Sequence, residues 1–112
     1  DDGSLSNRRV WADLTNIEKD YRPVPDGICL DEENAIWMAS PSTNEVIRIK
    51  EGGKIVDKIA VQTNAYACVL GGKDRRTLFV CTSESSDMQS CIDKREGRIE
   101  SFQVEIPGVG IP

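Results

Sequence analysis

Short apolar runs alternate with polar or glycine-containing links along most of the chain. The apolar runs span residues 9–14, 27–30, 35–39, 45–49, 54–61, 67–70, 77–81 and 98–106. No segment keeps a 3.6-residue hydrophobic period over a dozen residues, so the pattern predicts strands and not helices. The links are short and rich in glycine, proline, asparagine and aspartate, which favours hairpins between successive antiparallel strands. We therefore expect an all-β fold.

A weak internal repeat groups these strands. The stretch GICLDEENAIWMAS can be laid over YACVLGGKDRRTLFVCTS, which pairs Cys29 with Cys68, Trp37 with Phe79 and Ala39 with Cys81. A period of about 40 residues with four strands per unit is typical of β-propeller blades. The repeat predicts antiparallel four-stranded blades, with Trp37 and Phe79 at equivalent positions in the core between blades.

The blade count falls short of a closed ring. Residues 27–61 account for one complete blade, residues 66–106 for three strands of a second, and residues 9–14 for the last strand of a blade whose start is missing. A closed propeller needs about four blades or more, and this chain supplies about two. The polar segment 83–96 interrupts the second blade and is interpreted as a plain surface loop, with a functional lid as the alternative.

Composition narrows the class of protein. The chain has 112 residues, enough for one modest domain, and we assign residues 1–112 to a single propeller domain without a separate second one. Lysine and arginine number 14 against 19 acidic residues, a formal charge of -5, which disfavours a nucleic-acid surface. No apolar run approaches the ~20 residues of a membrane helix, and the first residues do not resemble a signal peptide. We expect a soluble, cytoplasmic protein without nucleic-acid or membrane partners.

The cysteine and histidine content excludes several kinds of site. The chain has four cysteines, no C-x-x-C pair and no histidine, which excludes a structural zinc cluster, a Cys-His nucleophile pair and a Ser-His-Asp triad. Cys29, Cys68 and Cys81 lie within apolar runs, where a free thiol behaves as a small hydrophobe. We expect these three to face the core, Cys91 to be exposed, and all four to remain reduced.

Several motifs together carry a family resemblance. The stretches SLSNRRVWADL, VPDGICLDEENAIWMAS, NEVIRI with GGKIVDKI, and ACVLGGKDRRTLFVCTS followed by GRIESFQVEIPGVG occur in that order. In order and spacing the chain resembles the C-terminal part of the senescence-marker-protein, gluconolactonase and luciferin-regenerating-enzyme-like family. The resemblance implies part of a six-bladed β-propeller. It also implies an axial divalent cation, calcium or zinc, and hydrolysis of sugar-acid lactones or related esters.

The Pro25-Asp26-Gly27 motif is where the resemblance bears on chemistry. Taken alone, this motif is more often a turn than a ligand site. The resemblance implies that Asp26 is a metal ligand with a catalytic role, and that the other ligands lie in segments preceding this sequence. The inner strand of a propeller blade starts near the axial channel, so a carboxylate just before Gly27 is well placed for a hard cation.

Further candidate residues flank the two inner strands. Tyr66, near the start of the second inner strand, is a candidate to line the substrate channel. Asp31, Glu32 and Glu33 form a carboxylate cluster that is interpreted as a solvated turn.

Two functions stay open from the sequence. The first is the C-terminal portion of a metal-dependent lactonase acting on a small lactone, with doubtful activity of this chain alone. The second is a non-catalytic part-propeller completed by copies of itself or by a separate N-terminal chain, since exposed blade edges otherwise invite aggregation.

Overall fold

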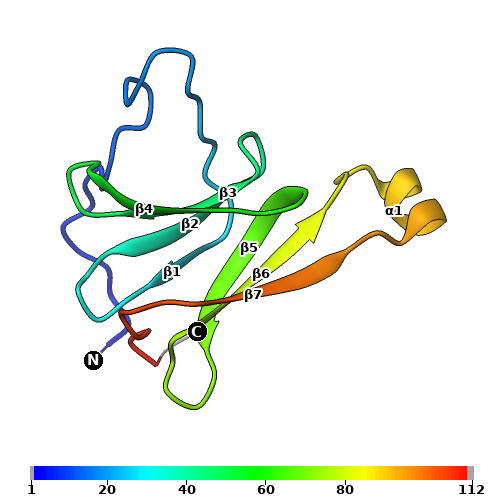
Figure 1. The fold of residues 1–112 in the computed structure, drawn as a ribbon. Helices are drawn as coiled ribbons and strands as arrows, with labels where there is room; N and C mark the ends of the chain where they lie inside the picture. Colours follow the sequence, from blue (N-terminus) through cyan, green and yellow to red (C-terminus); the bar gives the residue numbers. More distant parts are fainter. Residues whose placement is uncertain (1, 111–112) are drawn as a thin grey trace.

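The computed structural model describes residues 2–110, which form two antiparallel sheets and one short helix (Figure 1). The strands are β1 (Ile28–Leu30), β2 (Ile36–Ser40), β3 (Glu45–Ile49), β4 (Ile55–Ala60), β5 (Asn64–Gly71), β6 (Thr77–Ser83) and β7 (Arg98–Gln103), and the helix is α1 (Met88–Lys94). The first sheet has the order β1-β2-β3-β4 and the second the order β5-β6-β7. The all-β prediction is confirmed, as are the four-strand unit within residues 27–61 and the three-strand unit after it.

The core lies between the two sheets. Strand β2 alternates, so that Trp37 and Ala39 point toward the second sheet while Met38 points to the opposite face. Trp37 is 1% exposed and packs with Val46 from β3 and Val80 from β6. The predicted burial of Trp37 between blades is therefore confirmed.

A β-bulge sets the face that β5 presents to this core. Ala65 pairs with Thr82 and Ala67 with Cys81, so Tyr66 is the extra residue. An extra residue reverses the alternation of side chains along a strand. Ala65 and Cys68, three positions apart, consequently both point into the core between the sheets.

The N-terminal segment differs from the prediction. Residues 9–14 were expected to form a strand, but within residues 2–110 no strand precedes β1. The segment instead runs over the other face of the first sheet, where Ala12 and Leu14 pack against Met38 and Ile47. Its contact with the sheet includes one backbone hydrogen bond, from the Gly52 amide to the Trp11 carbonyl at 2.8 Å. The segment lies across a face of the sheet, and within residues 2–110 it joins neither sheet as a strand.

The outer face of the second sheet is apolar and exposed. We use the name outer face for the side formed by Ala67, Val69, Phe79, Cys81 and Ile99, which together line a hollow. Ile99 is 72% exposed, and Cys81 is exposed as well. The expectation that Cys81 faces the core is wrong for this chain, because no other sheet packs on this face within residues 2–110.

The two sheets relate to each other as successive blades would. In a propeller, each blade is a rotated copy of the one before. The outer face of the second sheet should therefore correspond to the face of the first sheet that packs against the second. Directly paired residues share a face, and Cys29 pairs with Trp37 while Val69 pairs with Phe79. Trp37 and Phe79 therefore lie on corresponding faces of the two sheets, in agreement with their predicted equivalence. The alignment of Cys29 with Cys68 is wrong by one residue, because the bulge at Tyr66 turns Cys68 to the opposite side.

The segment 83–96 contains a helix that the sequence did not predict. Asp87 caps α1, its carboxylate accepting a hydrogen bond from the Ser90 amide at 2.9 Å. The helix has seven residues, too few for a hydrophobic period, and none of them is buried. Figure 1 shows α1 at the far end of the hairpin formed by β6 and β7. In the described part of the chain, no helix is long and apolar enough to cross a membrane.

Truncating Trp37 tests the core between the sheets. Trp37→Ala should lower the free energy of unfolding by about 3–5 kcal/mol, because a fully buried aromatic side chain leaves a cavity in both sheets' packing. Ile99→Ala, at an exposed apolar position, is the control and should change it by about 0.5 kcal/mol or less. Urea denaturation followed by fluorescence and circular dichroism measures both. Equal small losses for the two variants would contradict the assigned core.

Candidate functional site

The Pro25-Asp26-Gly27 motif extends the pairing of β1 with β2 beyond the strand itself. The Asp26 amide donates a hydrogen bond to the Ala39 carbonyl at 3.0 Å, and the Ala39 amide donates to the Gly27 carbonyl at 2.9 Å. The backbone of Asp26 is thus fixed against a buried strand, while its side chain is exposed. The motif is a strand entry with a defined geometry and not a free turn.

Gly27 lies in direct contact with the bulge of β5. Its amide donates a hydrogen bond to the Tyr66 carbonyl at 2.9 Å. A Cβ atom at position 27 would lie 2.7 Å from the Cα atom of Ala67, closer than side chains ever approach. Glycine is therefore required here by the close approach of the two backbones. This contact joins the start of the first sheet to the second.

The same contact brings together the two residues that the sequence singled out. Asp26 directly precedes Gly27, and Tyr66 carries the carbonyl that Gly27 binds. Tyr66 is half-buried and is the extra residue of the bulge, a feature that re-aims side chains next to functional sites. We call Asp26, Gly27 and Tyr66 the junction. The roles of Asp26 as metal ligand and of Tyr66 as substrate contact stay predictions.

The junction offers one side-chain carboxylate, that of Asp26, to a ligand. Within residues 2–110, no hydrogen bond or ion pair engages the Asp26 carboxylate, and no group of three or more His, Cys, Asp or Glu residues could hold a metal ion. A calcium ion takes about 6–8 oxygen ligands. The exposed Asp26 carboxylate fits one of these positions, and the described chain does not provide the rest.

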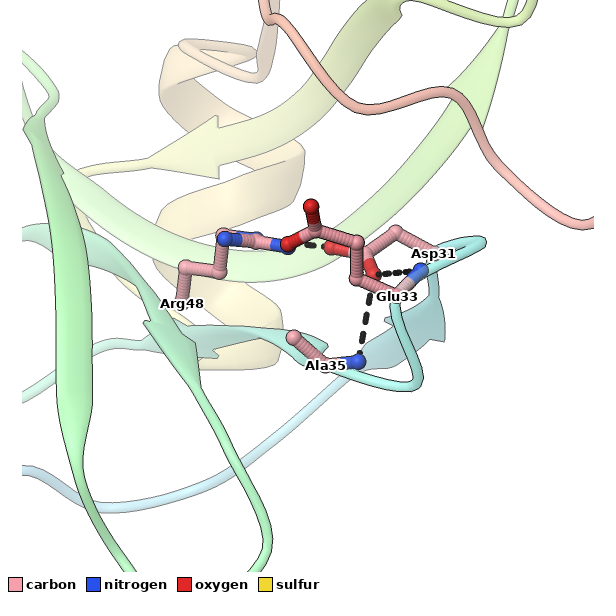
Figure 2. A network of polar contacts seen from close by, with 4 residues as sticks. All are labelled: Asp31, Glu33, Ala35 and Arg48. Carbon is pink, nitrogen blue, oxygen red and sulfur yellow. Dashed lines mark hydrogen bonds and ion pairs between the residues drawn. The ribbon is translucent and has the colours of Figure 1, made fainter.

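The interpretation of the carboxylate cluster after β1 as a solvated turn is wrong for Asp31, although Glu32 and Glu33 are exposed in that turn. Asp31 is 0% exposed. Figure 2 shows its carboxylate between the hairpin backbone and Arg48. One oxygen accepts hydrogen bonds from the Glu33 amide at 2.9 Å and the Ala35 amide at 3.1 Å, and the other accepts one from the Arg48 guanidinium at 2.7 Å. Both oxygens of this carboxylate are therefore engaged, one by the hairpin backbone and the other by β3.

Arg48 on β3 holds both carboxylates of this hairpin. It contacts buried Asp31 through Nε and the half-exposed Glu33 through the other end of the guanidinium, at 2.9 Å. The hydrogen bond to Asp31 is the main cause that raises the pKa of Arg48, with a further contribution from Glu33. The third acidic residue, Glu32, accepts a hydrogen bond from Arg75 in the β5–β6 turn at 2.8 Å. The cluster is therefore structural: it fastens the β1–β2 hairpin to its own sheet and to the second.

Sequence reasoning missed Arg48 as the partner of Asp31 because the two residues are seventeen positions apart. A usable signal was present in the pattern of β3, where Arg48 is a charged residue between two isoleucines. The pairing of Arg48 with Trp37 places it on the face that packs against the second sheet, where a charge requires a partner.

Comparison with known proteins agrees with this architecture. The chain superposes on a luciferin-regenerating enzyme with a TM-score of 0.72, at 22% identity, over 94% of this chain and 36% of that one. It superposes on a calcium-binding protein, regucalcin from Agrobacterium tumefaciens strain C58, with a TM-score of 0.66, at 21% identity, over 92% of this chain and 35% of that one. The fold is that of a partial β-propeller.

Sequence comparison then gives the family. The model of the SMP-30/Gluconolactonase/LRE-like region matches residues 1–84. Regucalcin from Bos taurus is 33% identical over 115 aligned positions, which cover 98% of this chain and 36% of that protein. The chain belongs to the SMP-30/gluconolactonase/LRE-like family, which confirms the resemblance seen in the motifs. It spans about a third of the length of the relatives it matches.

Removing the Asp31 charge tests the structural role of the hairpin cluster. Asp31→Asn should lower the free energy of unfolding by on the order of 3 kcal/mol, because Arg48 then lies nearly buried without its main counter-charge. Glu33→Gln is the matched control, since Glu33 binds the same guanidinium but is 49% exposed, and it should cost about 1 kcal/mol or less. Urea denaturation of both variants measures the difference. Similar losses would argue against a special role of the buried carboxylate.

Adding one methyl group tests the close approach at the junction. Gly27→Ala should lower the free energy of unfolding by about 1–3 kcal/mol, because the new Cβ atom overlaps the backbone of β5. Gly97→Ala is the control, since a Cβ atom there meets nothing within 4 Å. That variant should be neutral or slightly stabilising. A neutral Gly27→Ala variant would mean that the two sheets are further apart at this point.

Proposed function

We propose that this chain is part of a metal-dependent lactonase, in which Asp26 supplies one oxygen ligand to a divalent cation, calcium or zinc. The observation that supports the proposal best is the state of the Asp26 carboxylate. It is exposed and unengaged within residues 2–110, although its backbone is hydrogen-bonded to a buried strand. Asp31, only five positions away, is fully engaged in holding a hairpin.

Family membership supports the same proposal. The family's description includes gluconolactonase, one structural neighbour is called a luciferin-regenerating enzyme, and another is called a calcium-binding protein. A bound divalent cation would polarise a lactone carbonyl and lower the pKa of a bound water. Asp26 would contribute charge and one coordinating oxygen, and the junction backbone would hold that oxygen in place.

Tyr66 is proposed to line the space in which the lactone lies. The bulge fixes its backbone, through the hydrogen bond from Gly27, at the same end of the sheets as Asp26. A half-buried phenol offers an apolar ring and one hydroxyl, which suits a small lactone with a sugar-like ring. Tyr66 would orient the substrate and exclude water on one side of the metal site.

The proposal needs further blades, because one carboxylate does not make a cation site. We propose that additional blades, from the same or another chain, pack on the outer face and supply the remaining ligands. The equivalence between the outer face and the buried face of the first sheet supports this arrangement. A cytoplasmic location is part of the proposal, since all four cysteines are free thiols in the structure, as suits a reducing compartment.

A non-catalytic assembly module is the second candidate, and the exposed outer face is the observation that favours it. In this case copies of the chain would cover one another's outer face without completing a metal site. The number of chains per particle, measured by light scattering with intact mass, separates the two candidates. A closed ring of identical chains without bound metal would favour the module.

Hydrolysis of gluconolactone tests the proposed activity. The isolated chain should be inactive, and the chain completed by upstream blades should hydrolyse the lactone in the presence of calcium or zinc. In the completed protein, Asp26→Ala should lower kcat/KM by on the order of 100-fold or more, since losing even an outer-shell partner of a ligand costs about 10- to 100-fold. Asp57→Ala, which removes an exposed acidic residue on β4, should leave kcat/KM unchanged. Circular dichroism checks that both variants keep the fold.

Two results would contradict the proposal. The first is lactone hydrolysis by the isolated chain at the rate of the completed protein. The second is a metal-loaded, completed protein that hydrolyses no lactone or ester.

A further inference from the structure

We propose that Cys29 and Cys68 form a reactive thiol pair, which a small disulfide such as oxidised glutathione converts into a disulfide bond between the two sheets. This inference does not depend on the lactonase proposal. It concerns a covalent modification site that lies next to the junction.

The geometry of the two strands places the thiols together. Cys29 is the central residue of β1 and Cys68 lies in the middle of β5, and their Sγ atoms are 3.9 Å apart. The close approach of Gly27 to Ala67 holds the two backbones in contact beside the pair. A disulfide needs the sulfur atoms about 2 Å apart, so the two side chains must turn further toward each other when the bond forms.

The surroundings of the two thiols differ. Cys68 is 8% exposed, and its Sγ atom lies 3.4 Å from the Trp37 carbonyl oxygen and 3.6 Å from that of Gly27. Cys29 is half-buried and therefore open to a reagent on one side. The pair thus has an accessible thiol that attacks first and a buried thiol that reacts second.

The directions of the two pKa shifts favour the same order of reaction, with Cys29 first. The hydrogen-bonding contact between the two thiols is the main cause that lowers the pKa of Cys29. A backbone hydrogen bond from Leu70 lowers it further, while burial and the charge of Asp31 act in the opposite direction. The pKa of Cys68 is raised, chiefly by its contact with Cys29 and then by burial. Cys29 is therefore the thiol that ionises first, and the thiolate is the nucleophile in disulfide exchange.

The reaction proceeds in two exchanges. The Cys29 thiolate attacks one sulfur of oxidised glutathione, forming a mixed disulfide and releasing one glutathione thiolate. Capping removes the thiolate of Cys29, and with it both the hydrogen bond and the charge through which Cys29 raises the pKa of Cys68. Cys68 then loses its proton and attacks the Cys29 sulfur, releasing the second glutathione. Two protein thiols are oxidised, one oxidised glutathione is reduced, and both protons end on the two glutathione molecules.

The other two cysteines provide an internal contrast. Cys81 lies on the outer face and Cys91 on α1, and both are exposed. The Cys91 Sγ atom lies 3.2 Å from the Ser85 carbonyl oxygen and has no thiol partner among residues 2–110. Each of these two thiols should form a mixed disulfide with glutathione and react no further. Oxidation of the pair would overturn the expectation that all four thiols remain reduced.

The experiment uses the double variant Cys81→Ser with Cys91→Ser, which leaves only the pair. On incubation with oxidised glutathione, this protein should lose both free thiols while gaining no glutathione mass. Digestion without reduction should yield one peptide pair joined through Cys29 and Cys68. The urea midpoint should rise on oxidation and return to its starting value after dithiothreitol, because the new bond closes a long loop between the sheets.

Two single substitutions in the same background test the order of attack. Cys68→Ser should accumulate one glutathione on Cys29, because the second thiol is missing. Cys29→Ser should react far more slowly with oxidised glutathione, because its one remaining thiol, Cys68, is buried. If either variant fails to fold, the thiol count and peptide map of the double variant still decide.

Three results would overturn the proposal. The first is that both thiols of the double variant stay free at a concentration of oxidised glutathione that modifies Cys81 and Cys91 in the original protein. The second is stable addition of two glutathione molecules to the pair. The third is a disulfide found only between different chains.

Discussion

The contact between Gly27 and the bulge of β5 is the constraint on which the rest of the structure depends. The absence of a side chain at position 27 lets the start of β1 come within hydrogen-bonding distance of Tyr66. That approach determines how closely the two sheets pack and therefore how tightly Trp37 is enclosed. It also fixes the position of Asp26 and brings the Cys29 and Cys68 thiols together. A larger residue would disturb the core, the candidate ligand and the thiol pair at once.

The bulge at Tyr66 has a second effect, because it determines which face of β5 is buried. Without the extra residue, the alternation that begins at Ala65 would turn Ala67 toward the first sheet and Cys68 away from it. With it, Cys68 points into the core and Val69 joins the outer face. The same irregularity thus creates the thiol pair and leaves the outer face continuous and apolar. Both consequences follow from one backbone feature that a simple repeat does not reveal.

The sequence predicted the strands well because hairpins are local. Residues 45–49 match β3, and the other six strands lie within a few residues of the expected runs. Contacts between elements were harder to predict. The burial of Asp31 depends on Arg48, and the exposure of Cys81 depends on whether another sheet covers the outer face. At the candidate site, the family resemblance indicated Asp26, and position along the inner strand indicated Tyr66. The glycine contact that brings their backbones together required the structure.

Two acidic residues near the ends of the same short strand show how position decides the use of a carboxylate. Asp31 follows β1, where the nearly buried Arg48 and two hairpin amides bind its oxygens, so it stabilises the fold. Asp26 precedes β1, where the pairing with Ala39 uses its backbone and leaves its side chain exposed. An exposed carboxylate would be compatible with folding at either end of β1. The stability of the fold alone therefore does not explain why Asp31 is buried and Asp26 is exposed. The difference bears on the proposed metal site, because a cation at Asp26 would break no hydrogen bond or ion pair within residues 2–110, whereas at Asp31 it would have to break the ion pair with Arg48 and two hairpin hydrogen bonds.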